Sequence, residues 1–122
     1  MRLALETDPS IHLIRGYGDG RVAINDQSLT RPCIVSPHTL LPDWPASSVE
    51  ALDATLFEPL LATGAQIVLL GEGETQQLPS TDLRKLCRSR GIALESMNLG
   101  AACRTYNILA NEGRAVVAGL FP

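Results

Sequence analysis

Cys103 and the arginine that follows it are the residues of this chain best suited to carry out chemistry. The apolar pattern from Leu99 or Gly100 to Asn111 predicts a helix, which places Cys103 near its N-terminus. A helix N-terminus and an adjacent cation, here Arg104, both favour the thiolate and lower the pKa of a cysteine. Cys103 is therefore a candidate nucleophile, and a small buried hydrophobic residue is the alternative interpretation.

No base accompanies this thiol in the sequence, because His12 and His38 both lie in the other half of the chain. The other cysteines are Cys33 and Cys87, so the number of cysteines is odd, and none forms a C-x-x-C pair. This spacing indicates neither a disulfide framework nor a zinc site. We expect reduced thiols, no metal and no cofactor.

Gly71, Glu72 and Gly73 directly follow an apolar run, as the glycine loop of a dinucleotide site does. The third glycine of that motif is missing, since position 76 is Gln, and the next helical pattern begins only at Thr81. The carboxylate of Glu72 would also repel a phosphate. The sequence therefore favours a turn at the end of a strand over a dinucleotide site.

Size and composition predict a single globular domain spanning residues 1–122, of which 45% are hydrophobic. The net charge of −3 and the low aromatic content (4%) argue against a nucleic acid partner. No apolar run approaches the roughly 20 residues that cross a bilayer, and the N-terminus turns acidic too early for a signal peptide. We expect a cytoplasmic protein without a membrane span, and its oligomeric state is left open.

The elements that must position these residues fall into a β-rich half and a β/α half. The first half is expected to form strands at 11–17, 21–25 and 28–36, the first two joined by a Gly-Asp-Gly turn, and then a loop at 37–48 anchored by Trp44. The expected later elements are helices at 49–54, 56–62, 81–90 and from 99 or 100 to 111, and strands at 66–70, 92–97 and 115–120. The strands at 66–70, 92–97 and 115–120 alternate along the chain with the last two helices, which predicts a parallel β-α-β-α-β unit.

Two of the expected helices carry polar stripes. One stripe is basic and consists of Arg84, Lys85 and Arg88; the other is a narrow seam of Arg104, Asn107 and Asn111. A docking surface for an acidic partner is one interpretation of the basic stripe, and a solvated helix face is the other.

Four stretches together resemble a known family. They are Ile34-Val35-Ser36-Pro37 with Leu40 and Trp44; Leu69-Leu70-Gly71-Glu72-Gly73; Leu78-Pro79 with Leu83-Arg84 and Arg90-Gly91-Ile92; and Ala101 to Asn107 with Glu112-Gly113-Arg114. The sequence is similar to the Mth938-like domain family, small bacterial and archaeal proteins related to mitochondrial complex I assembly factor 3. The resemblance implies an α/β (α+β) fold of three layers, in which an antiparallel β-hairpin sheet accompanies a mixed sheet and helices.

The resemblance implies no reaction, and two hypotheses stay open. The first is a non-enzymatic binding or assembly-type module with a protein partner. The second is a small-molecule ligand binder or enzyme that uses a cleft at the carboxyl edge of the sheet, near Cys103. The residues expected to line a cleft or a binding surface are Gly71, Glu72, Gly73, Cys103, Arg104, Tyr106, Asn107 and Arg114.

The chain also departs from the family pattern at this edge. The family often has Gly-Thr-Gly at positions 71–73, where this chain carries Glu72, and often Thr in place of Leu99. We therefore expect Asn98 to cap the following helix, and we do not expect a conventional anion site there.

Overall fold

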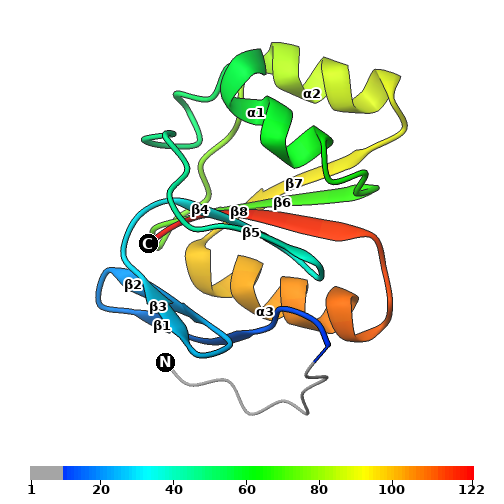
Figure 1. Ribbon diagram of the computed structural model, residues 1–122. Helices are drawn as coiled ribbons and strands as arrows, with labels where there is room; N and C mark the ends of the chain where they lie inside the picture. The colour runs from blue at the N-terminus through cyan, green and yellow to red at the C-terminus, as the bar shows by residue number, and fades with distance from the viewer. Residues whose placement is uncertain (1–9) are drawn as a thin grey trace.

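The computed structural model describes residues 10–122, which form two β-sheets and three helices (Figure 1). The elements in chain order are β1 (Ile14–Gly18), β2 (Arg21–Ile24), β3 (Gln27–Leu29), β4 (Cys33–Ser36), β5 (Thr39–Leu41), α1 (Ala54–Leu61), β6 (Ile67–Glu72), α2 (Thr81–Ser89), β7 (Ala93–Met97), α3 (Leu99–Asn111) and β8 (Val116–Phe121). A small antiparallel sheet has the order β1-β2-β3, and a mixed sheet has the order β5-β4-β8-β6-β7.

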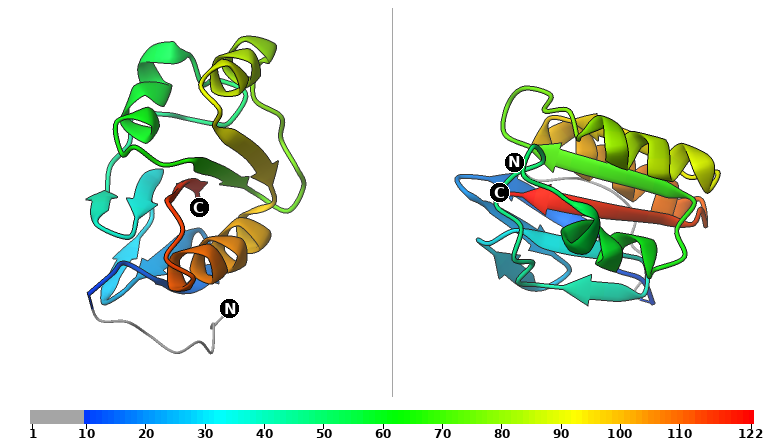
Figure 2. Two further views of the ribbon diagram at one scale, coloured as in Figure 1. Left: turned by 90° about the vertical axis from the view of Figure 1, so that its right-hand side faces the viewer. Right: turned by 90° about the horizontal axis from the view of Figure 1, so that it is seen from above.

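The mixed sheet separates two hydrophobic cores. Helices α1 and α2 cover one of its faces, and α3 covers the other, where it also packs against β1 of the small sheet (Figures 1 and 2). Trp44, Phe57 and Leu70 belong to the core beneath α1 and α2, whereas Leu69 and Tyr106 belong to the core around α3. Adjacent residues of β6 thus enter different cores, because side chains alternate between the faces of a strand.

The β-α-β-α-β unit predicted for the second half is confirmed. It runs β6-α2-β7-α3-β8, with β6 in the middle and parallel to both β7 and β8. Ser80 caps α2 and Asn98 caps α3, each accepting a hydrogen bond from the backbone of the first turn. The expectation that Asn98 acts as the cap is therefore correct.

The single strand expected at 28–36 is wrong. Its residues form two strands in different sheets, β3 and β4, with Pro32 between them. Proline lacks a backbone N–H and cannot donate to the hydrogen bonds between strands. Pro32 therefore lies where the chain leaves the small sheet and enters the mixed sheet. Its carbonyl oxygen instead accepts a hydrogen bond from the backbone of Trp44, at 2.8 Å.

The segment expected to be a loop at 37–48 contains a further strand. Ser36 pairs with Thr39 across a two-residue turn, so β4 and β5 form a hairpin at the edge of the mixed sheet. The rest of the segment is anchored as expected, because Trp44 is buried and its Nε1 donates to the Leu56 carbonyl at 2.9 Å.

The helix expected at 49–54 does not form. Ser48 accepts a hydrogen bond from the Ala51 backbone, which closes a turn, and the chain then begins a new helix after Asp53. The Asp53 carboxylate accepts from the backbone of Leu56 at 2.8 Å and so fixes the start of α1. α1 therefore corresponds to the helix expected at 56–62, and the Asp53 cap makes it begin two residues earlier than expected.

Candidate functional site

A cleft of about 830 Å³ lies at the carboxyl ends of β6 and β8, where the second hypothesis expects it. Its walls are the β1–β2 turn, the start of α3 and the ends of the two strands. The ionisable and aromatic side chains in its lining are Tyr17, Asp19, Glu72, Glu74, Arg104 and Phe121. Three carboxylates and one guanidinium therefore give this cleft an acidic balance.

Gly71, Glu72 and Gly73 each have a structural role at this edge. A Cβ atom at position 71 would lie only 2.4 Å from the Cβ of Ala102, so glycine lets α3 approach the sheet. The Glu72 carboxylate accepts a hydrogen bond from the backbone of Val49 at 3.0 Å. The Gly73 carbonyl accepts from the backbone of Leu99 at 2.9 Å. These residues hold the loop before α1 and the start of α3 against the end of β6.

Most of the backbone amides at the N-terminus of α3 already have partners within the chain. The backbone N–H of Leu99 donates to Gly73, and those of Ala101 and Ala102 donate to the side chain and the carbonyl of Asn98. Three of the first four N–H groups of the helix are thus paired within the chain. This agrees with the expectation that the edge is not a conventional anion site.

Arg104 and Tyr17 form the main feature of the cleft wall. The guanidinium carbon lies 5.9 Å from the centre of the tyrosine ring, and Nη1 donates to the tyrosine hydroxyl. The ring also lies against Gly100, where a Cβ atom would come within 2.8 Å of it. At this distance the guanidinium is within range of a cation–π interaction with the ring.

Cys103 points into the core instead of the cleft. Its side chain is buried, and burial raises its pKa to about 12, to which neighbouring Cys33 contributes and which Arg104 only partly opposes. The expectation of a lowered pKa is therefore wrong. Desolvation of a thiolate outweighs both the helix N-terminus and the adjacent cation at this position.

Tyr106 and Asn107 are also buried and bind the segment around β1. The Tyr106 hydroxyl donates to the His12 carbonyl at 2.8 Å, and burial raises the pKa of this tyrosine above its usual range. Asn107 accepts from the Ile14 N–H at 2.8 Å and donates to the Ile14 carbonyl at 2.7 Å. The polar seam expected at Arg104, Asn107 and Asn111 is therefore interrupted by β1 and is not a continuous surface.

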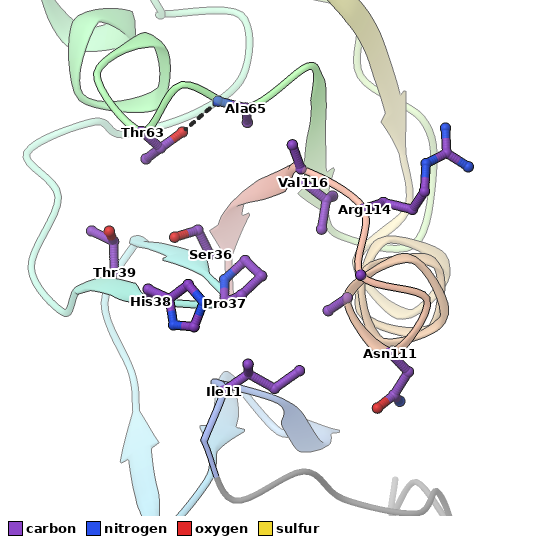
Figure 3. A pocket seen from close by; sticks show the side chains of 13 residues that line it. Ile11, Ser36, Pro37, His38, Thr39, Thr63, Ala65, Asn111, Arg114 and Val116 are labelled. Atoms are coloured by element: carbon purple, nitrogen blue, oxygen red, sulfur yellow. Dashed lines mark hydrogen bonds between the residues drawn. The ribbon is translucent and has the colours of Figure 1, made fainter.

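A second cleft, of about 460 Å³, lies at the opposite end of the sheet (Figure 3). The β4–β5 hairpin contributes Ser36 and His38 to its lining, and Thr63 stands on the far side. Arg114 reaches the rim, with its guanidinium turned away from the cavity. Of the residues singled out in the sequence, Arg114, and Asn111 of the expected polar seam, line this cleft. The hairpin residues were missed because Ser36 was expected to end a strand and His38 to lie in a loop, and no signal in the sequence paired these two segments as a hairpin.

The described residues show neither a metal cluster nor a membrane-spanning helix. In 10–122, no group of three or more His, Cys, Asp or Glu side chains is arranged to hold a metal ion. No helix of the same residues is long and apolar enough to cross a bilayer.

Comparison with known proteins identifies relatives over nearly the whole chain. A family model described as "Protein of unknown function (DUF498/DUF598)" matches residues 14–121. The human protein named NADH dehydrogenase (ubiquinone) 1 alpha subcomplex assembly factor 3 is 31% identical over 111 residues. The alignment covers 89% of this chain but 60% of the human protein, so the chain spans about three fifths of the length of that relative.

Solved structures of bacterial proteins have the same fold. A Xanthomonas campestris protein is 38% identical, with a TM-score of 0.83 over 99% of this chain and 92% of its own. A Bordetella pertussis protein described as an Mth938-like domain is 25% identical, with a TM-score of 0.81 over 100% of this chain and 92% of its own. The fold and the family resemblance expected from the sequence are both confirmed.

Proposed function

This chain belongs to the DUF498/DUF598 family, described as proteins of unknown function, and we propose that it is a non-enzymatic binding module of the assembly-factor type. Residues 1–122 act as one such domain, and its location is cytoplasmic. Its task is to bind a protein partner during the assembly of a larger complex.

The observation that carries the proposal is the similarity to the human assembly factor. That protein is 31% identical over 111 residues, and the alignment covers 89% of this chain. Members of one fold can differ in function, so a shared fold alone would carry less weight than this sequence relationship.

The state of the candidate nucleophile supports binding over covalent catalysis. Cys103 lies in the core with a pKa raised to about 12, so hardly any thiolate is present near neutral pH. Cys33 is equally buried, and burial raises its pKa to about 12 as well. Neither thiol can attack a substrate in the cleft without a rearrangement of the core.

Affinity purification from the cell of origin tests the proposal. The full chain carries a small tag, is expressed at its natural level, and is compared with the tag alone by quantitative mass spectrometry. We expect specific enrichment of subunits or assembly proteins of a respiratory complex. Enrichment of no protein above the tag-only control would contradict a binding role.

The cleft at the carboxyl edge favours a second candidate function, the binding of a small molecule. The specific observation is the Arg104–Tyr17 pair on the wall of a cavity whose size suits a small ligand. A ¹⁵N NMR screen of metabolite mixtures tests it, with Arg104→Gln as the site variant. A ligand that shifts the amides of 17–20 and 98–104 in the wild type and loses affinity in the variant would support this candidate. Shifts that are unchanged by the substitution would place the ligand elsewhere.

A further inference from the structure

The outer face of α2 concentrates positive charge in an acidic protein. Arg84, Lys85, Arg88 and the following Arg90 are all exposed to solvent. They make up four of the ten Lys and Arg residues of a chain whose net charge is −3. We name these four residues the α2 cationic face.

The cations of this face have no acidic partner within the described residues. Elsewhere Arg31 pairs with Asp43 at 2.7 Å, the one salt bridge found in 10–122. On α2, the Arg84 side chain donates to the Thr81 hydroxyl at 3.2 Å, and that is the only side-chain hydrogen bond of the four cations in this part of the chain. Their charge is therefore available to another molecule.

The helix holds these side chains away from the core. Leu83 and Cys87 are buried on the opposite side of α2, against the mixed sheet and α1. Figure 1 shows α2 on the outer surface of the layer that covers this sheet. Arg84 and Arg88 are one helical turn apart, which brings their Cβ atoms to about 6 Å from each other, with Lys85 beside them.

Helix stabilisation explains only part of this arrangement. Cations near a helix C-terminus are favoured by the helix dipole, which accounts for Arg88 and Arg90. Arg84 ends the first turn and Lys85 follows it, where the dipole gives a cation no advantage. Asp82 is the charge that suits this end of the helix.

We propose that the α2 cationic face docks an acidic helix of a protein partner, whose carboxylates are spaced four residues apart and face Arg84 and Arg88. The inference rests on the proposed binding function and names the surface and the partner chemistry for it. The planar guanidinium groups match carboxylates with two parallel hydrogen bonds each, so arginine suits this role better than lysine.

The composition of the face favours an acidic protein over other anionic partners. A helix that binds a lipid surface inserts apolar side chains beside its cations, but the apolar residues of α2 are directed into the core. Binding of single-stranded nucleic acid uses aromatic side chains for stacking, and α2 contains none. Carboxylates on a partner helix need neither feature.

A titration with helical peptides tests the proposal on the full chain. The first peptide is an alanine-based helix with glutamates four residues apart along one face. The second has the same composition, with its glutamates spread around the helix. ¹⁵N NMR should show shifts confined to the amides of 81–91, and we expect the one-face peptide to bind about fivefold more tightly than the other.

Two double variants with equal changes in net charge separate the surface from bulk electrostatics. R84E/R88E should weaken binding of the one-face peptide about tenfold, because two favourable pairs become repulsive. R15E/R21E reverses two exposed cations outside α2 and should change binding less than about twofold. R84Q/R88Q should give an intermediate loss, and its circular dichroism spectrum shows whether α2 still folds.

Three results would overturn the inference. They are equal losses in the two charge-reversal variants, peptide-induced shifts outside α2, and α2-dependent binding to phosphatidylglycerol vesicles or to a DNA oligonucleotide that exceeds binding to the peptide. Failure of the proposed function looks different, because the wild type then enriches no partner from cells above the tag-only control. If the wild type does enrich a partner and R84E/R88E enriches it equally, the binding role stands and this surface is wrong.

Discussion

Replacing Asn107 by alanine should destabilise the protein more than any other exchange of a polar side chain on α3. The amide of Asn107 substitutes for a neighbouring strand: it accepts from the N–H of Ile14 and donates to its carbonyl, at 2.8 and 2.7 Å. All of these groups are buried. The two hydrogen bonds join β1 to α3 across 93 positions in the sequence.

The expected loss follows from what the substitution leaves behind. Asn107→Ala leaves one buried N–H and one buried carbonyl without a hydrogen-bond partner, and each such group costs about 1–3 kcal/mol. We expect a loss of about 3–4 kcal/mol, out of the roughly 5–15 kcal/mol that is typical of a domain. For this size of protein the melting temperature should fall by roughly 10–15 °C.

Urea denaturation measures the difference, and the same helix supplies a matched control. Asn111 is the same residue type one turn later, but it is exposed, so Asn111→Ala should cost less than about 0.5 kcal/mol. The urea midpoint of Asn107→Ala should fall, while the slope of its unfolding free energy against urea concentration stays that of the wild type. Equal midpoints for the two variants would show that the contact with β1 does not stabilise the fold.

Further predictions concern the thiols and the edge of the sheet. A thiol reagent at pH 8 should label Cys87 before Cys103, as mapped by mass spectrometry. Burial raises the pKa of Cys103 to about 12, whereas Arg90 offsets part of the rise in the pKa of Cys87. Early labelling of Cys103 would contradict its burial. Gly71→Ala should lower stability by about 2–3 kcal/mol in urea, since its Cβ atom would collide with α3, whereas Gly73→Ala, with a positive φ but open space, should cost about 1 kcal/mol. Glu72→Ala should cost about 1 kcal/mol and increase hydrogen exchange at 48–52, and Glu72→Gln should restore most of the protection.

The elements of the second half could be predicted from the sequence because their signals are local. α2 begins after a serine cap and ends near a glycine of positive φ, and its apolar face repeats with helical spacing. α3 and the apolar runs of β6 and β8 are equally clear. Local patterns of this kind allow such elements to be recognised without knowledge of their tertiary contacts.

Sheet membership could not be predicted, because it depends on distant partners. Residues 28–36 look like one strand, yet β3 pairs with β2 and β4 pairs with β5 and β8. Nothing in the local alternation of side chains distinguishes the two sheets. Only the proline between β3 and β4 indicated an irregularity.

The burial of individual side chains on α3 could not be predicted from the local sequence either. Helical spacing correctly places Arg104 and Asn107 on adjacent turns of one stripe. Residues of β1 contact both side chains, but only Asn107 is buried by this contact, while Arg104 stays exposed. Cys103 sits where dipole and cation arguments favour a thiolate, and the packing of the core reverses the outcome. The rule that clefts lie at the carboxyl ends of parallel strands did predict the position of a cleft, because this rule depends on topology alone.

The central claim, that this domain works by binding a protein, is tested most directly with two purified components. The partner recovered from cells is produced alone and titrated into the full chain by isothermal calorimetry. We predict saturable binding with a fixed stoichiometry, which weakens in R84E/R88E and stays nearly unchanged in R15E/R21E. Absence of saturable binding between the two purified proteins would show that recovery from cells was indirect and would contradict the claim.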